Sequence, residues 1–315
     1  MKLPELRIAD LVARLPVLQG GMAVRISTAP LAAAVANEGG IGIIAGTGME
    51  PEELRDEIRK TRSLTDGIVG VNVLFAVNRF ADLVKTAISE KIDLVISGAG
   101  FSRDMFGWGC ESGTPIVPVV SSAKLAVLAQ KMGAAAVVVE GKEAGGHLGT
   151  DRPMRDILPE VRAAVSIPVI GAGGVIDGYD IAATMRLGAD GVQMGTRFAA
   201  SFESNASEEF KRMYVEARPE DVVLVHSPVG LPGQGLRNRF FTRVESGLHH
   251  DDTSCQNCLK RCSHSFCIMD ALVNANRDGN PDRALIFCGE CVDRIHEILS
   301  VPDIFRNLLR EAALA

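Results

Sequence analysis

Cysteine is the residue type whose spacing first suggests chemistry in this sequence. Six of the seven cysteines lie between positions 255 and 291, as Cys-x2-Cys-x3-Cys-x4-Cys followed by Cys-x2-Cys, and the only other one is Cys110. Thiolates this close together can converge on one soft centre, so the segment predicts an iron–sulfur cluster or a tetrahedral zinc ion. The uneven gaps differ from the paired knuckles of a zinc ribbon and favour [4Fe–4S], with zinc as the alternative. Disulfides are the weaker alternative in a chain with no export signal.

Glycine-rich segments are the second chemical signal, because they follow most of the apolar runs in the first 200 residues. Without side chains, glycines let a phosphate or a flat ring approach the backbone N–H groups, so together they predict a phosphorylated cofactor. The alternative for any one of them is a glycine that only permits a tight turn. The segments are 19–23, 70–72, 97–100, 140–147, 171–174 and 193–197.

His147 ends the segment Glu140-Gly-Lys-Glu-Ala-Gly-Gly-His. An imidazole with a pKa near neutrality can take a proton from a carbon acid or donate one to a reduced product, so His147 is the candidate catalytic residue. The alternative is a loop histidine that only hydrogen-bonds neighbouring backbone.

The elements that must position these residues follow from the alternation of short apolar runs with longer amphipathic stretches, which is typical of βα units on a parallel sheet. Eight units in about 200 residues predict a (β/α)8 TIM barrel, with the chemistry at the C-terminal ends of the strands. Residues 101–113 are the least regular and are predicted to be mostly loop. The predicted strands are 17–21, 41–44, 67–73, 93–97, 116–120, 135–140, 168–171 and 191–194, and the predicted helices are 29–38, 51–61, 79–90, 123–132, 155–165, 178–187 and 207–217.

The character of the chain changes after about residue 241. We predict a TIM barrel over residues 1–245, a linker at 247–252 and a cysteine-rich C-terminal extension over 246–315. The formal net charge of −6 argues against a nucleic-acid partner. No secretory signal and no apolar stretch of membrane-spanning length is visible, so we expect a cytoplasmic protein with no membrane contact.

The motifs QGGM, GVN, EGKEAGGHLG, GAGG and QMGTRF occur here in this order. Over about residues 10–240 the chain resembles the nitronate monooxygenase (2-nitropropane dioxygenase) family of FMN barrels, which includes FMN-dependent enoyl-ACP reductases and NADH:quinone reductases. The resemblance implies FMN, with the backbone of Met22 and Ala23 against the isoalloxazine, Asn72 and Glu140 near its polar edge, Gly145 beside it and His147 over it. It implies that the ribityl phosphate is held by Gly173, Gly174, Gln193, Met194, Gly195 and Thr196.

The resemblance extends to the tail, since some members end in a similar CLK-x-C…C-I…FCG segment. It implies that Cys258, Cys262, Cys267 and Cys288 are the ligands and leaves Cys255 and Cys291 spare.

Three functions follow as expectations. The first is oxidation of a nitronate, with dioxygen reoxidising the flavin. The second is an NAD(P)H-dependent reductase acting on an enoyl-ACP, a quinone or another acceptor, and the third is a non-catalytic flavin- or metal-binding module that docks a partner. A small-molecule substrate is common to the first two, and an electron-transfer partner, an acyl carrier protein and a homodimer are left open. The sequence does not decide the natural acceptor, the donor or the oligomeric state.

Overall fold

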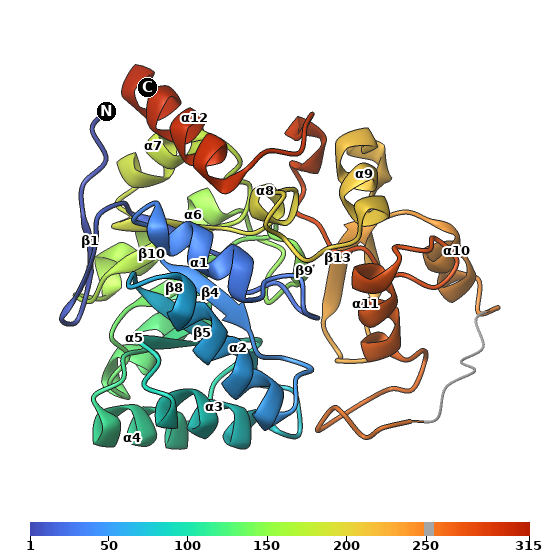
Figure 1. The fold of residues 1–315 in the computed structure, drawn as a ribbon, viewed down its shortest axis with the longest axis horizontal. Coiled ribbons are helices and arrows are strands. Elements are labelled where there is room, and N and C mark those ends of the chain that lie inside the picture. The colour runs from blue at the N-terminus through green and yellow to red at the C-terminus, as the bar shows by residue number, and fades with distance from the viewer. Residues whose placement is uncertain (249–254) are drawn as a thin grey trace.

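The core of the protein is a barrel of eight parallel strands (Figure 1), seen in a computed structural model that describes residues 1–248 and 255–315. The strands lie in the order β3-β11-β10-β8-β7-β6-β5-β4, and a parallel bridge between Leu18 and Ile41 joins the two ends of this order. The predicted TIM barrel is therefore confirmed, and each of the eight predicted runs forms a strand. The strands are β3 (Val17–Gln19), β4 (Gly42–Ala45), β5 (Val69–Leu74), β6 (Leu94–Gly98), β7 (Ile116–Val120), β8 (Val137–Glu140), β10 (Val169–Ala172) and β11 (Gly191–Met194).

Burial on both faces explains why these strands are apolar runs rather than alternating patterns. All four residues of β4 and of β10 are buried, for example. The hairpin of β1 (Leu6–Ile8) and β2 (Leu11–Ala13) adds Leu6 and Ile8 to the buried cluster that contains Leu18 of β3 and Ile170 of β10. Apolar side chains therefore fill the barrel, which leaves its chemistry to the loops at the strand ends.

The helices cover the outside of the barrel, and α4 forms where a loop was predicted. The segment 101–113 was expected to be mostly loop, but residues 103–112 form α4. Its N-cap Ser102 accepts a hydrogen bond from Met105 N at 3.3 Å, and Gly113 ends it with φ +72°. The helices that follow the first seven strands are α1 (Ala29–Asn37), α2 (Pro51–Leu64), α3 (Phe80–Ser89), α4 (Arg103–Ser112), α5 (Ala123–Lys131), α6 (Met154–Ala164) and α7 (Gly178–Arg186), and α8 (Thr196–Ala199) is a single turn after β11.

The helix that packs beside α7 and α1 is α12 (Val301–Leu314), at the far end of the chain (Figure 1). Glycine permits this contact, because a Cβ on Gly178 would lie 2.2 Å from the carbonyl oxygen of Leu308. The Gly178 amide also donates to Glu311 Oε2 at 3.0 Å. The helix predicted at 207–217 does form, as α9 (Glu208–Glu216), but it packs against η2 (Val292–Arg294) instead of completing the barrel.

A second lobe stands beside the mouth of the barrel (Figure 1). Its antiparallel sheet has the order β12-β13-β9, so the two-residue strand β9 leaves the barrel connection to pair with β13. Residues on both sides of the predicted boundary at 245 build this lobe, and α12, after the lobe, packs against the barrel helices. A separate extension over 246–315 stays a prediction. Residues 249–252 of the predicted linker lie outside the described residues. The lobe contains β9 (Gly146–His147), α9, η1 (Pro219–Asp221), β12 (Val222–His226), β13 (Pro232–Leu236), α10 (Arg239–Glu245), α11 (Ile268–Arg277) and η2.

Within the described ranges, no helix combines the length and the apolar character needed to cross a membrane.

Candidate functional site

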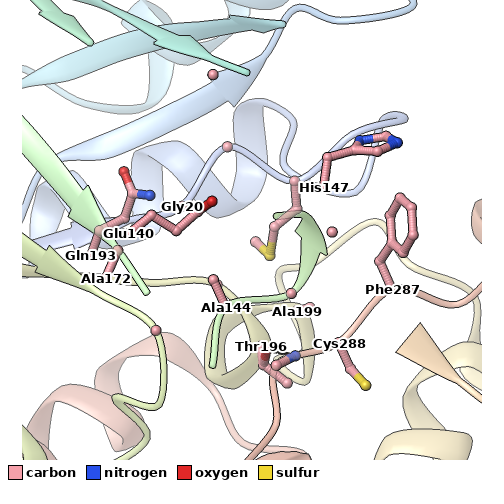
Figure 2. A pocket seen from close by; sticks show the side chains of 18 of the residues that line it. Gly20, Glu140, Ala144, His147, Ala172, Gln193, Thr196, Ala199, Phe287 and Cys288 are labelled. Carbon is pink, nitrogen blue, oxygen red and sulfur yellow. Dashed lines mark hydrogen bonds between the residues drawn. The ribbon is translucent and has the colours of Figure 1, made fainter. Parts of the chain in front are cut away.

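A pocket lies where the C-terminal ends of the barrel strands face the second lobe (Figure 2). All but one of the predicted cofactor residues line it, although they come from five different strand ends. The exception is Met194, whose side chain is buried in the barrel core. Its carbonyl oxygen accepts a hydrogen bond from Gly20 N at 2.8 Å. The predicted residues in the lining are Met22, Ala23, Asn72, Glu140, Gly145, His147, Gly173, Gly174, Gln193, Gly195 and Thr196.

The second lobe supplies pocket residues that the sequence did not indicate: Tyr214, Leu272, Phe287 and Cys288. The Tyr214 hydroxyl donates a hydrogen bond to the carbonyl oxygen of Phe287, which fastens this wall to α9. These residues lie far along the chain from the glycine motifs, and no local pattern connects them. Only the folding of the lobe over the barrel brings them to the site.

In the described part of the chain, the pocket lining contains two buried side-chain oxygens that lack a partner. Asn72 Oδ1 and Gln193 Oε1 are buried and have no hydrogen-bond partner, whereas Asn72 Nδ2 donates to Gly21 O at 3.1 Å. Buried acceptors without a donor are costly, so such atoms point to a bound group that supplies N–H or O–H donors. The edge of an isoalloxazine ring offers such a donor, and the residues present therefore fit FMN.

Glu140 lies at the same end as Gln193 (Figure 2). Burial raises the pKa of its carboxyl group to about 8, with no positive charge offsetting it. At neutral pH the group is therefore mostly a neutral acid, able to donate a hydrogen bond as well as accept one.

Glycines allow backbone segments to lie close together in the rest of the pocket. A Cβ on Gly145 would lie 2.6 Å from the carbonyl carbon of Cys288, so only glycine fits between the barrel loop and the second lobe. Gly173 and Gly174 have φ of +107° and +73°, in the region that favours glycine. Thr196 Oγ1 accepts from Gly289 N at 2.9 Å, which ties the loop after β11 to the same wall. Backbone turns of this kind can bind a phosphate through N–H groups, without a metal ion.

His147 stands at the other end of the pocket, beside Phe287 (Figure 2). Its Nε2 is 2.7 Å from the hydroxyl oxygen of Ser227, and its ring meets that of Phe287 edge-to-face at 5.2 Å. Burial lowers its pKa to about 4, so the expected pKa near neutrality is wrong and the imidazole is neutral at pH 7. A neutral imidazole can accept a proton or a hydrogen bond through one nitrogen while it donates through the other.

The structure does not bring the four predicted metal ligands together. Cys288 is buried in the cofactor-pocket wall, and burial raises the pKa of its thiol well above the usual range. Cys258, Cys262 and Cys267 line a different pocket, together with Cys255 and part of α11. In the part of the chain that the structure describes, no three His, Cys, Asp or Glu side chains are arranged to hold a metal ion. The predicted ligand set is corrected accordingly, because Cys288 lines the cofactor pocket whereas Cys258, Cys262 and Cys267 line a second pocket.

A family model described as nitronate monooxygenase matches residues 6–98 and 74–311. The chain is 35% identical to the (3aS,4S,5R,7aS)-5-hydroxy-7a-methyl-1-oxo-octahydro-1H-indene-4-carboxyl-CoA dehydrogenase of Mycobacterium tuberculosis, over 74% of this chain and 66% of that protein. It is 31% identical to a probable nitronate monooxygenase of Staphylococcus aureus, over 73% of this chain and 77% of the relative.

Among solved structures, FabK from Thermotoga maritima superposes with a TM-score of 0.88 at 36% identity, covering 98% of this chain and 96% of that one. The chain thus spans nearly the whole of this structure but about two thirds of the Mycobacterium relative.

Proposed function

The chain belongs to the nitronate monooxygenase family of oxidoreductases, and we propose that it is an FMN-dependent enzyme that oxidises a nitronate or a similarly activated carbon acid. The observation that carries the proposal is the pairing, in one pocket, of buried acceptors that lack a donor with a neutral, half-buried histidine. FMN, when bound, supplies electron transfer between the organic substrate and a second acceptor such as dioxygen.

The residues that would hold FMN form two groups, one for the ring and one for the phosphate. Asn72, Glu140 and Gln193 would offer side-chain acceptors to the polar edge of the ring, and neutral Glu140 would also offer a donor. The backbone at Gly173, Gly174 and Thr196 offers N–H groups suited to the phosphate.

His147 is proposed as the group that binds and deprotonates the substrate. When Ser227 donates its hydroxyl proton to Nε2, the other ring nitrogen carries hydrogen and can donate to an oxygen of a nitro or nitronate group. When Nε2 donates to Ser227 instead, the other nitrogen is free to accept a proton from carbon. Phe287 packs against the ring and restricts both water access and ring rotation.

A second candidate is an NAD(P)H-dependent reductase acting on an enoyl thioester carried by an acyl carrier protein, or on a quinone. The similarity to FabK from Thermotoga maritima over 98% of this chain favours it. The proposed pocket residues are the same in both candidates. They differ in whether the organic substrate delivers or receives electrons.

Anaerobic mixing separates the two. Protein loaded with FMN is mixed under nitrogen with propyl-2-nitronate, with NADH or with NADPH, and the flavin absorbance is followed. Bleaching by the nitronate alone supports nitronate oxidation, and bleaching by a nicotinamide alone supports the reductase. Protein that takes up no FMN, or whose flavin reacts with none of the three, contradicts both.

A further inference from the structure

A short segment of the second lobe, residues 289–294, lies against the barrel loops that would hold the phosphate of FMN. Gly289 N donates to Thr196 Oγ1, in the loop after β11, at 2.9 Å. A Cβ on Gly174, in the loop after β10, would lie 3.8 Å from the Sγ atom of Cys291. The start of the segment is therefore placed beside both loops.

The last residue of this segment, Arg294, reaches the start of α7. Its Nη2 lies 2.5 Å from Asp177 Oδ2 and 2.9 Å from Asp180 Oδ2, and its Nη1 lies 3.2 Å from Asp180 Oδ1. Only 37% of the Arg294 side chain is exposed, and 29% and 24% of the two aspartate side chains, so salt and water screen these contacts only in part. One guanidinium group thus pairs with two carboxylates more than 110 positions away in the chain.

The two carboxylates already occupy the N-terminal end of α7. Asp180 Oδ2 accepts a hydrogen bond from Ile176 N at 2.8 Å, and Asp177 Oδ1 accepts one from Asp180 N at 2.9 Å, so these N–H groups are not free to bind a phosphate. Asp177 directly follows Ile176, which lines the cofactor pocket. Two negative charges next to the lining would repel a phosphate held by the neighbouring backbone.

The pocket lining itself offers no cation to offset these charges. Within the described residues, no lysine or arginine lines the pocket, whereas the side chains of Glu140 and Glu143 do. Backbone N–H groups at the glycine turns can bind a phosphate, but they carry only partial charges. Arg294 is therefore a cation placed to offset the acidic pair beside the phosphate end of the pocket.

We propose that Arg294 is a positioning residue through which the pocket selects FMN over riboflavin, the flavin without a phosphate. By pairing with Asp177 and Asp180, Arg294 cancels part of their negative charge and fixes the turn before α7, which lowers the repulsion felt by a phosphate at that turn. The inference rests on the proposed FMN site and adds to it a residue that lies outside the pocket lining.

The test compares the affinities of the protein for FMN and for riboflavin, which differ only in the phosphate. Full-length protein is stripped of flavin and titrated with each compound, and quenching of flavin fluorescence gives the two dissociation constants. In Arg294→Ala the dissociation constant for FMN should rise by about tenfold, because charges near a protein surface interact through an effective dielectric constant of about 20. The dissociation constant for riboflavin should not change, since riboflavin has no phosphate to be repelled.

Charge variants separate this electrostatic role from a structural one. Arg294→Lys keeps the positive charge and should bind FMN nearly as the wild type does. Adding Asp177→Asn to Arg294→Ala removes one unpaired negative charge and should restore part of the affinity for FMN, since asparagine caps a helix as well as aspartate does. Arg306→Ala is the matched control, because Arg306 pairs with Asp303 on α12 and its side chain is 73% exposed. It should bind both flavins with wild-type affinity.

Two results would overturn the role of Arg294: equal losses of FMN and riboflavin affinity in Arg294→Ala, or an unchanged affinity for FMN. A wild-type protein that binds neither flavin would instead refute the cofactor assignment on which the proposal rests. Far-UV circular dichroism shows whether each variant is folded, and Arg294→Gln replaces Arg294→Ala if the alanine variant is not.

Discussion

His147 Nε2 lies 2.7 Å from Ser227 Oγ, although the two residues are 80 positions apart in the chain. His147 is on β9 and Ser227 follows β12, and both strands pair with β13 in the sheet of the second lobe. This sheet thereby aims the histidine into a pocket whose floor belongs to the barrel. The orientation of the candidate catalytic group therefore depends on the sheet of the second lobe.

Replacing His147 with alanine should leave FMN bound and reduce turnover by about 10²–10⁴-fold, since a general acid–base group typically contributes that much. The measurements are flavin absorbance after gel filtration and steady-state kinetics with the substrate found by anaerobic mixing. His226→Ala is the matched control, because His226 is exposed at the end of β12 in the same sheet. Wild-type turnover in flavin-loaded His147→Ala would remove the catalytic role.

The dependence of kcat/KM on pH should reflect the lowered pKa of His147. Because burial lowers its pKa to about 4, a reaction that needs the neutral imidazole should keep its kcat/KM as the pH falls through 6.5 and lose it only near about pH 4. The profile is measured with a substrate that does not titrate in this range. An acid limb near pH 6.5 would show that the imidazole is far more hydrated than its packing indicates.

Replacing Ser227 with alanine should lower kcat by about tenfold, which corresponds to roughly one hydrogen bond, without loss of FMN. Ser227→Thr keeps the hydroxyl and should restore most of the activity. A lower kcat with retained FMN would indicate that Ser227 acts through His147. A residue that only stabilises the lobe would instead change FMN retention and thermal stability. Unchanged kcat in Ser227→Ala would separate Ser227 from the reaction.

Glu140 should make the free energy of unfolding depend on pH. Burial raises its pKa from 4.5 to about 8, so between these values the folded protein keeps a proton that the unfolded chain releases. Its contribution is fully present below pH 4.5 and is lost as the pH rises through about 8. Glu140→Gln cannot ionise, so in urea unfolding of FMN-free protein its stability relative to wild type should improve by a few kcal/mol from about pH 4.5 to pH 8.

The control for this experiment is Glu52→Gln, because the Glu52 side chain is 82% exposed. It should follow the wild-type curve at every pH. Parallel curves for wild type and Glu140→Gln would mean that the carboxyl group is ionised in the fold.

Replacing Gly178 with alanine should destabilise the protein by about 1–3 kcal/mol, the usual cost of overpacking, because the new Cβ meets the backbone of α12 at Leu308. Gly107→Ala is the matched control: it lies in α4 with nothing within 4 Å of the added atom, and should stabilise slightly through helix propensity. Thermal or urea unfolding measures both. Equal stability of the two variants would contradict the packing of α12 on α7.

The eight strands could be predicted from the sequence because each is a local run of apolar residues bounded by turns. α4 could not, since Gly107 and Gly109 weaken its intrinsic preference. Its packing compensates: a Cβ on Gly109 would lie 2.5 Å from Ile116, so the glycine allows the helix to sit against β7.

The cysteine pattern shows the opposite case, a strong local signal with a misleading spatial meaning. The resemblance grouped Cys288 with Cys258, Cys262 and Cys267, but the structure places Cys288 in one pocket and the other three in another. Whether Cys288 joins the other three thiols depends on the path of the chain between Cys267 and Cys288. Spacing along the sequence does not specify that path, because it depends on how α11 packs.

The sequence by itself determined the barrel, the glycine turns at the strand ends and the family, because periodic burial and turn chemistry are properties of short segments. The tertiary structure alone decided three further features: α12 beside α7, Ser227 beside His147, and a thiol pocket apart from the cofactor site. Each depends on packing between residues far apart in the chain, where shape and burial, rather than local preference, select the contact. Burial also moved the pKa of His147 and Glu140 in opposite directions, because a dry pocket disfavours the charged form of both a base and an acid.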